Sequence, residues 1–254
     1  MTARGRWLRA VVRRPAGAVG AALVAVVTIT GAVGPALAPH DPFAVKGPSL
    51  TQPSWAHPMG TDALGRDTFS GVLHGMRTSV LVALAVAGVV IVIGLVIGML
   101  AGYVMGRVDD VLMRATEFVQ VLPRFFLAIL VIALFGPGID RLVLVLGLTS
   151  WTLLARVVRA EVFSLREREF VEAARADGAS GFRIVTRELI PNVVPATVVT
   201  VGLVAAQVML IEASLSFLGL GDPNVVSLGS LASQGQQLLR VAWWTSIFPG
   251  VAIL

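Results

Sequence analysis

The chain has 254 residues, of which 56% are hydrophobic and only 14% are charged, and its mean hydropathy is +0.84. A soluble domain carries about 25% charged residues, so this chain has too little polar surface to cover a globule of its size, and lipid must replace water over much of it. This composition excludes a soluble enzyme.

The basic excess lies at the N-terminus. The formal net charge is +5, and residues 1–14 hold five arginines with no acid. The rest of the chain is neutral, so the pI near 11.1 does not indicate nucleic-acid binding. Cysteine is absent, which excludes disulfides, thiolate metal sites and thiol nucleophiles. The single lysine, Lys46, is followed by Gly47 and cannot complete a phosphate-binding P-loop.

Two apolar stretches predict membrane spans in the first half of the chain. Residues 16–38 are uncharged and follow the arginine cluster, and their end, Ala36-Leu37-Ala38, is similar to a signal-peptidase site. Signal h-regions run about 7 to 15 residues, so a retained first span is favoured over cleavage. Residues 78–106 contain no charge and form the clearest span.

Four further spans are predicted. Residues 111–135 form a third, interrupted by Pro123 and Arg124, and residues 142–158 a fourth, with a turn at residues 136–138 between them. Residues 195–217 form a fifth, which contains Gln207 and Glu212. A sixth begins at Val241 but has only 14 residues. Those residues reach about 21 Å against a hydrocarbon core near 30 Å, so we expect the last helix to be truncated in this chain.

The arginines predict the orientation. A cytoplasmic N-terminus places residues 1–15, 107–112 and 159–194 inside, and residues 39–77, 136–141 and 218–240 outside. Fourteen basic residues then lie at or near the inner segments and five at the outer ones. This asymmetry agrees with the positive-inside rule.

The charged segment at residues 159–194 predicts two short helices. Residues 166–177 contain strong helix formers with Phe170, Ala173 and Ala174 on one stripe, and Gly178 stands where a left-handed residue ends a helix. Ser180 can cap the second helix, which Pro191 prevents from continuing with the same geometry.

Three interpretations of this segment differ in what it contacts. A plain connecting loop would pair Arg168 with Glu172 one turn apart. A DNA-reading helix-turn-helix is disfavoured because residues 165–188 hold five arginines and five acids, which leaves little charge for phosphates. A docking element for a partner is favoured, because four apolar side chains would otherwise be exposed on a charged loop. They are Phe170, Phe182, Ile184 and Leu189.

The same segment resembles the EAA loop of permease subunits of bacterial ABC importers. The resemblance lies in Glu172-Ala173-Ala174, Gly178 four residues after Ala174, and Pro191 thirteen residues further on. Three other stretches resemble the dipeptide and oligopeptide group of that family: HPMGTDALGRD at residues 57–67, LREREF at 165–170 and EASLSFLGLG at 212–221. The chain departs from the family pattern at Glu188, Ile190 and Arg124.

The resemblance implies an all-α polytopic membrane protein with six transmembrane helices of the type I ABC importer permease kind. Residues 1–77 would form the N-terminus, first helix and extracytoplasmic segment, and residues 78–254 a five-helix core with its coupling loop at 159–194. The chain would be a transport subunit of the bacterial plasma membrane with no catalytic residue and no cofactor of its own. Its partners would be a homologous permease, two cytoplasmic ATPases that hold ATP and Mg²⁺, and an extracytoplasmic solute-binding protein.

The resemblance also implies roles for single residues. The helix at 172–178 would enter a groove on the ATPase, and the coupling residues would be Phe170, Glu172, Ala173, Ala174, Gly178, Phe182 and Pro191. Apart from the resemblance, Glu212 and Arg124 are predicted to face protein or an aqueous path, because an ionised side chain at the bilayer centre is costly. Together with Gln207 they are the predicted residues of the translocation pathway. For Arg124, snorkelling to the headgroups is the alternative.

The outer segment holds His40, His57 and His74 with Asp41, Asp62 and Asp67. A metal site is the disfavoured alternative, because their spacing matches no metal signature, and Asp62 is predicted to cap a helix that leads into the second span. We expect the solute-binding protein to dock on this segment and on residues 221–240.

Three classes of function remain after these arguments. An ABC importer permease for dipeptides or oligopeptides is favoured, with nickel chelates or another small ligand as alternative substrates. An ion-coupled secondary transporter leaves the charged loop without a role. An intramembrane serine hydrolase lacks the G-x-S-x-G motif and a nearby base.

Overall fold

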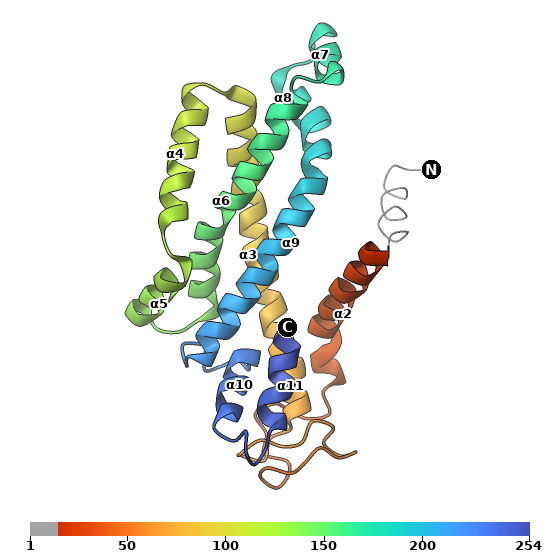
Figure 1. The fold of residues 1–254 in the computed structure, drawn as a ribbon, viewed down its shortest axis with the longest axis vertical. Helices are drawn as coiled ribbons and strands as arrows, with labels where there is room; N and C mark the ends of the chain where they lie inside the picture. Colours follow the sequence, from red (N-terminus) through yellow and green to blue (C-terminus); the bar gives the residue numbers. More distant parts are fainter. Residues whose placement is uncertain (1–14) are drawn as a thin grey trace. The chain divides into compact units, whose positions relative to one another are not determined.

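The computed structural model describes residues 15–254, so the arginine cluster of residues 1–14 lies outside the described residues. The described part is helical, with only two isolated β-bridges, Val45 with Arg66 and Thr61 with Asp67. The helices, labelled in Figure 1, are α2 (Pro15–Leu37), α3 (Thr68–Val104), α4 (Arg107–Val121), α5 (Arg124–Phe135), α6 (Ile139–Leu165), α7 (Glu169–Ala176), α8 (Gly181–Ile184), the π-helical segment η1 (Val185–Leu189), α9 (Ile190–Phe217), α10 (Leu228–Gln236) and α11 (Trp244–Ile253).

The chain forms two compact units. The first combines Met1–Leu81 with Ala213–Leu254, and the second is Val82–Glu212. The long helices α3 and α9 therefore contribute residues to both. An all-helical fold is the expected result for a lipid-exposed chain, since a helix satisfies its own backbone hydrogen bonds.

Glycines on one face of α3 allow it to approach α6 closely in the second unit. Gly94, Gly98 and Gly102 recur every fourth residue, and a Cβ at any of them would collide with α6. At Gly98 that Cβ would lie 2.6 Å from the carbonyl oxygen of Ala155 and 2.7 Å from Cβ of Val158. Small residues at this spacing are a common device for packing transmembrane helices, whose association gains little from the hydrophobic effect.

The helix pair α4 and α5 packs against α6 and is bent by 71° between them. Pro123 lies in the break and has an extended backbone. Proline lacks a backbone N–H and clashes with the preceding turn, which explains why the predicted third span is broken here. The turn predicted at Gly136-Pro137-Gly138 separates α5 from α6.

The first unit packs α2 against the start of α3. A Cβ at Gly31 would lie 2.8 Å from Cγ2 of Val80, and one at Gly34 would lie 3.3 Å from the carbonyl oxygen of Leu73. Most other apolar side chains of α2 are exposed, including Leu23 and Ile29, as a surface in lipid requires.

Most of the spans predicted from the sequence correspond to helices of the structure. Four helices are long and apolar enough to cross a membrane, or five if α4 and α5 count as one broken span, among the described residues. The sixth predicted span is represented by α11, which has 10 residues. The second span begins ten residues before its predicted start, because α3 already starts at Thr68.

Candidate functional site

The helix α7 is short and is anchored by one side chain. Glu169 and Glu172 lie in its first turn and Arg175 in its last, which complements the helix dipole. Val171 is fully buried, whereas Glu172 and Ala173 are exposed. Val171 was not predicted as an anchor, although an apolar valine between Phe170 and Glu172 in a charged segment indicates a position that faces the protein.

The turn after α7 has the geometry predicted for Gly178. The φ angle of Gly178 is +79°, its N–H donates to the Arg175 carbonyl at 3.0 Å, and the Ala179 N–H donates to the Ala174 carbonyl at 3.0 Å. This pair of bonds is a Schellman motif, in which a left-handed residue ends the helix. A Cβ at residue 178 would meet no atom within 4 Å, so only the backbone conformation requires glycine.

The second helix of this segment begins as predicted and continues further. The Ser180 hydroxyl accepts a hydrogen bond from the Arg183 N–H at 3.4 Å, which confirms the predicted cap. The helix then runs through η1 into α9 without ending at Pro191. Its geometry does change, since the π-helical turn of η1 ends at Leu189, two residues before the proline.

The four apolar side chains behind the docking hypothesis fall into two pairs. Ile184 and Leu189 are buried in the chain itself, so the expectation that they would be exposed was wrong. Phe170 is 36% exposed and Phe182 is 80% exposed. The ion pair between Arg168 and Glu172 expected of a plain connecting loop is not formed, although both residues lie in the described range.

This segment lies at one end of the second unit and forms one wall of a small open cavity. Figure 1 shows α7 beside α8, beyond the end of α6. A Cβ at Gly181 would lie 3.1 Å from the hydroxyl of Tyr103, which places the segment next to the end of α3. A cavity of about 210 Å³ opens between the two short helices. Its lining is Ala174, Asp177, Ala179, Arg183, Ile184 and Glu188.

The residues expected to line a pathway differ in exposure. The Glu212 side chain in α9 is 2% exposed, so it faces protein within this chain. Arg124 is half-buried at the first position of α5, directly after the bend. Gln207 is exposed, and Pro191 is exposed at the second position of α9.

An ion pair between α4 and α6 was not predicted. Arg159 donates from Nε to Oδ1 of Asp109 at 2.6 Å and from its terminal nitrogen to Oδ2 at 2.5 Å. Arg156 donates to the side-chain carbonyl of Gln120 at 3.0 Å. The members of each pair lie 50 and 36 residues apart, and no local spacing rule connects such positions.

The loop before α3, with the first turns of α3, packs in the first unit against residues that follow α9. Arg66 donates to the Gln234 side chain at 2.8 Å, and the indole N–H of Trp244 donates to the Thr61 carbonyl at 3.2 Å. The Thr78 hydroxyl donates to the Val226 carbonyl at 2.8 Å. Residues of both segments also line a cavity of about 370 Å³.

Asp67, not Asp62, caps α3, so that prediction was wrong. Asp67 accepts from the Ser70 N–H at 2.8 Å, three residues on, as an N-cap does. Asp62 instead orders its own loop, accepting from the N–H groups of Leu64 and Arg66 at 2.9 and 2.8 Å and from Nε of Arg66 at 2.6 Å.

Two solved structures of the inward-facing MetNI methionine ABC transporter share the fold. The first has a TM-score of 0.59 at 17% identity and covers 72% of this chain and 89% of that chain. The second has a TM-score of 0.58 at 18% identity with the same coverage.

Sequence comparisons identify the family. Residues 94–254 match the family described as binding-protein-dependent transport system inner membrane component. A putative peptide transport system permease protein of Brucella suis is 36% identical over 247 residues, 96% of this chain and 83% of its own length. The dipeptide transport system permease protein DppC of Bacillus subtilis is 35% identical, over 89% of this chain and 71% of its own. The oligopeptide transport system permease protein OppC of Escherichia coli K12 is 42% identical, over 76% of this chain and 64% of its own length. The chain belongs to this family of ABC importer permease subunits.

Proposed function

We propose that this chain forms half of the channel of an ATP-driven importer for dipeptides or oligopeptides. The observation that carries the substrate class is that relatives spanning up to 96% of this chain are named as peptide, dipeptide and oligopeptide permeases. Membership of a binding-protein-dependent family disfavours the secondary-transporter alternative. Specificity resides largely in the binding protein, so nickel chelates or another small ligand stay as alternative substrates.

The proposed energy source is ATP hydrolysis on two partner ATPases, which would hold ATP and Mg²⁺. The segment from α7 to η1 would couple that hydrolysis to the channel. Three features support this role: Glu172 and Ala173 are exposed, Phe182 stands out from the surface, and the turn at Gly178 positions both helices. Ile184 and Leu189 would hold the segment to the membrane helices while Phe182 contacts the ATPase.

The proposed topology places α7 in the cytoplasm and residues 39–77 outside, in a bacterial plasma membrane with the N-terminus inside. The arginine asymmetry supports it. Single-cysteine labelling is a clean test because the chain has no cysteine. Arg175→Cys should be protected from an impermeant maleimide added to intact cells, whereas Trp55→Cys should react. Reaction at position 175 would contradict the topology.

The proposed partner surface on the outside is formed by the two outer segments. Their packing through Arg66 with Gln234 and Trp244 with Thr61 supports a single docking surface for the solute-binding protein. Glu212, Arg124 and Gln207 remain proposed pathway residues. We also propose that the chain is divided by function into residues 1–77, with the first helix and the extracytoplasmic segment, and the five-helix core at residues 78–254.

Reconstitution tests the whole proposal. The chain, its permease partner, both ATPases and the binding protein would be placed in liposomes with ATP inside and labelled peptides or a nickel chelate outside. We expect peptide uptake that requires both ATP and the binding protein. Uptake driven by an ion gradient without ATP would contradict the importer, and uptake of the nickel chelate alone would contradict the peptide substrate.

A further inference from the structure

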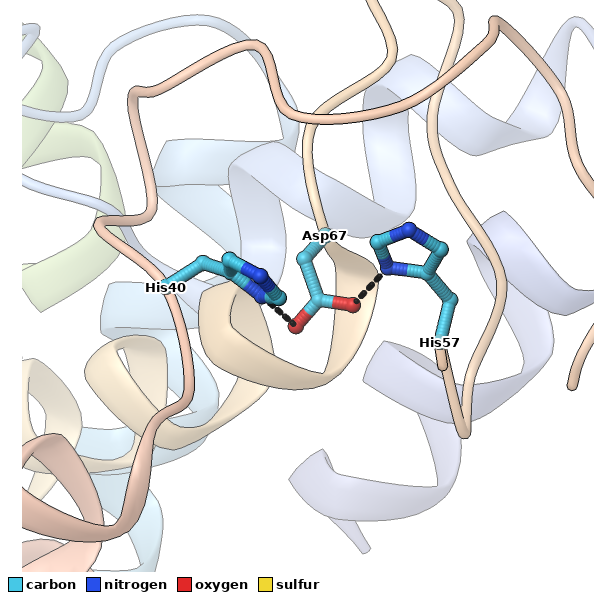
Figure 2. Close-up of side chains that lie close together, drawn as sticks. All are labelled: His40, His57 and Asp67. Atoms are coloured by element: carbon cyan, nitrogen blue, oxygen red, sulfur yellow. Dashed lines mark hydrogen bonds and ion pairs between the residues drawn. The ribbon is translucent and has the colours of Figure 1, made fainter. Parts of the chain in front are cut away.

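Three side chains from separate parts of the outer segment converge at the start of α3. His40 follows α2, His57 lies in the loop, and Asp67 precedes the first residue of α3. Figure 2 shows the two imidazoles on opposite sides of the Asp67 carboxylate. One ligand atom from each residue can be chosen so that all lie within 4.8 Å of one another.

The carboxylate of Asp67 is held firmly and is short of positive charge. Its side chain is fully buried, and Oδ2 accepts from the Ser70 N–H at 2.8 Å and from the Ser70 hydroxyl at 2.6 Å. The only basic side chains paired with it in the described residues are the two histidines. Burying a carboxylate is costly unless a positive charge or hydrogen bonds compensate it.

The two histidines approach this carboxylate differently. Nδ1 of His57 lies 2.9 Å from Oδ1 of Asp67, which is hydrogen-bonding distance. Nδ1 of His40 lies 4.0 Å from Oδ2, is buried and has no hydrogen-bond partner. A buried nitrogen that faces a carboxylate at this distance is too far for a hydrogen bond, yet it is placed to share a cation with it.

We propose that His40, His57 and Asp67 form a binding site for a divalent transition-metal ion of the zinc type. Two neutral imidazoles and one carboxylate are a donor set that zinc accepts, and their single negative charge suits a divalent cation. Ligand atoms about 2.0 to 2.1 Å from a tetrahedral zinc lie about 3.3 Å from one another. Nδ1 of His40 lies 4.0 Å from Oδ2 and therefore has to approach the carboxylate by several tenths of an ångström. Nδ1 of His57 lies 2.9 Å from the other oxygen, Oδ1, and becomes a ligand when the imidazole takes the tautomer that carries its proton on Nε2.

Neighbouring groups orient the ligands for this role. Ser70 fixes the carboxylate, and its hydroxyl also accepts from the backbone N–H of His40 at 3.2 Å. Gly47 packs against the far edge of the His57 ring, since a Cβ there would lie 3.1 Å from Nε2. Such supporting contacts are typical of metal sites and raise their affinity. The ion would tie the loop to α3, with water in the fourth coordination position.

Metal titration of the assembled transporter tests the site. The complex would be treated with chelator, placed in nanodiscs and titrated with Co²⁺, whose visible absorption reports tetrahedral coordination, and Zn²⁺ would then displace it. Wild type is compared with His40→Asn and His57→Gln. Asp67 is left intact because it also caps α3. His74→Gln is the matched control, since His74 hydrogen-bonds the Ser70 carbonyl at 2.9 Å and lies outside the cluster.

We expect the wild-type complex to bind one more equivalent of metal per copy of this chain than either ligand variant does. A ligand variant that still binds the ion should do so at least tenfold more weakly than wild type. His74→Gln should match wild type. Zn²⁺ should raise the melting temperature of wild type and His74→Gln, but not of the two ligand variants. Because the partner subunits are identical in every sample, their own metal sites cancel in this comparison. Equal metal binding by wild type and both variants, or no Zn²⁺-dependent shift in wild type, would overturn the proposal.

Discussion

Replacing Gly178 separates backbone conformation from contact at the proposed coupling segment. Its φ of +79° lies in the left-handed region, where a residue with a Cβ costs about 1 to 2 kcal/mol, and a β-branched residue costs more. No atom lies within 4 Å of an added Cβ, so the Cβ itself meets no steric collision. Gly178→Val should therefore strain the turn by about 1 to 3 kcal/mol. Gly178→Asn should cost less, because asparagine tolerates this conformation.

The strain should weaken coupling without affecting insertion. Because α7 is 8 residues long and Val171 is its only buried residue, the helix can yield by shifting or fraying. A loss of about 1 to 3 kcal/mol corresponds to about 5- to 150-fold in ATPase affinity. The assay measures ATPase retention on pull-down and peptide-stimulated ATP turnover in liposomes. We expect Gly178→Val to be inserted normally but to retain its ATPases poorly, and Gly178→Asn to remain close to wild type.

Two results would refute this reasoning. Full retention, turnover and uptake in Gly178→Val would show that the segment is only a connector. Equal impairment of Gly178→Val and Gly178→Asn would show that the partner excludes any side chain at this position, so that contact and not backbone strain decides the effect.

Three other substitutions test neighbouring parts of the account. Gly98→Val overfills the contact between α3 and α6 and should destabilise the protein by about 1 to 3 kcal/mol, with a smaller loss for Gly98→Ala. The loss is measured as a lower melting temperature in detergent. An unchanged melting temperature in both variants would contradict the close approach of the two helices. Asp109→Asn should lower the free energy of unfolding by about 1 kcal/mol or less, because its partner Arg159 is partly exposed. A double-mutant cycle with Arg159→Gln should give a measurable coupling energy between the two side chains, and a coupling energy of zero would show that they do not meet. Ser180→Ala removes the 3.4 Å hydrogen bond that caps α8 and should destabilise the segment by about 1 kcal/mol or less. ATPase retention should therefore fall less than in Gly178→Val. An equal or larger fall would be inconsistent with a capping role.

Local signals predicted much of the second unit. Uncharged length identified α3, proline with arginine located the break before α5, and a glycine between helix formers predicted the left-handed end of α7. The stripe of Gly94, Gly98 and Gly102 carried a further signal that we did not use, since its four-residue spacing predicts a helix contact.

Long-range partners could not be predicted from the sequence. Asp62 and Asp67 are both acidic residues before an apolar helix, and only the folded loop decides that Asp67 is the cap while Asp62 binds Arg66. The burial of Ile184 and Leu189 depends in the same way on tertiary packing. The meeting of His40 with His57 and Asp67 joins residues up to 27 positions apart with no fixed metal-ligand spacing.

Site-specific cross-linking tests most directly whether α7 meets the ATPase. Ala173→Cys and Trp55→Cys would each carry a benzophenone-maleimide, and the assembled transporter would be irradiated in native membranes. Both positions are exposed in the isolated chain, so labelling efficiency is matched. The account predicts an adduct with the ATPase from position 173 and an adduct with the solute-binding protein, never with the ATPase, from position 55. An ATPase adduct from position 55, or none from position 173 in a complex that imports peptide, would contradict it.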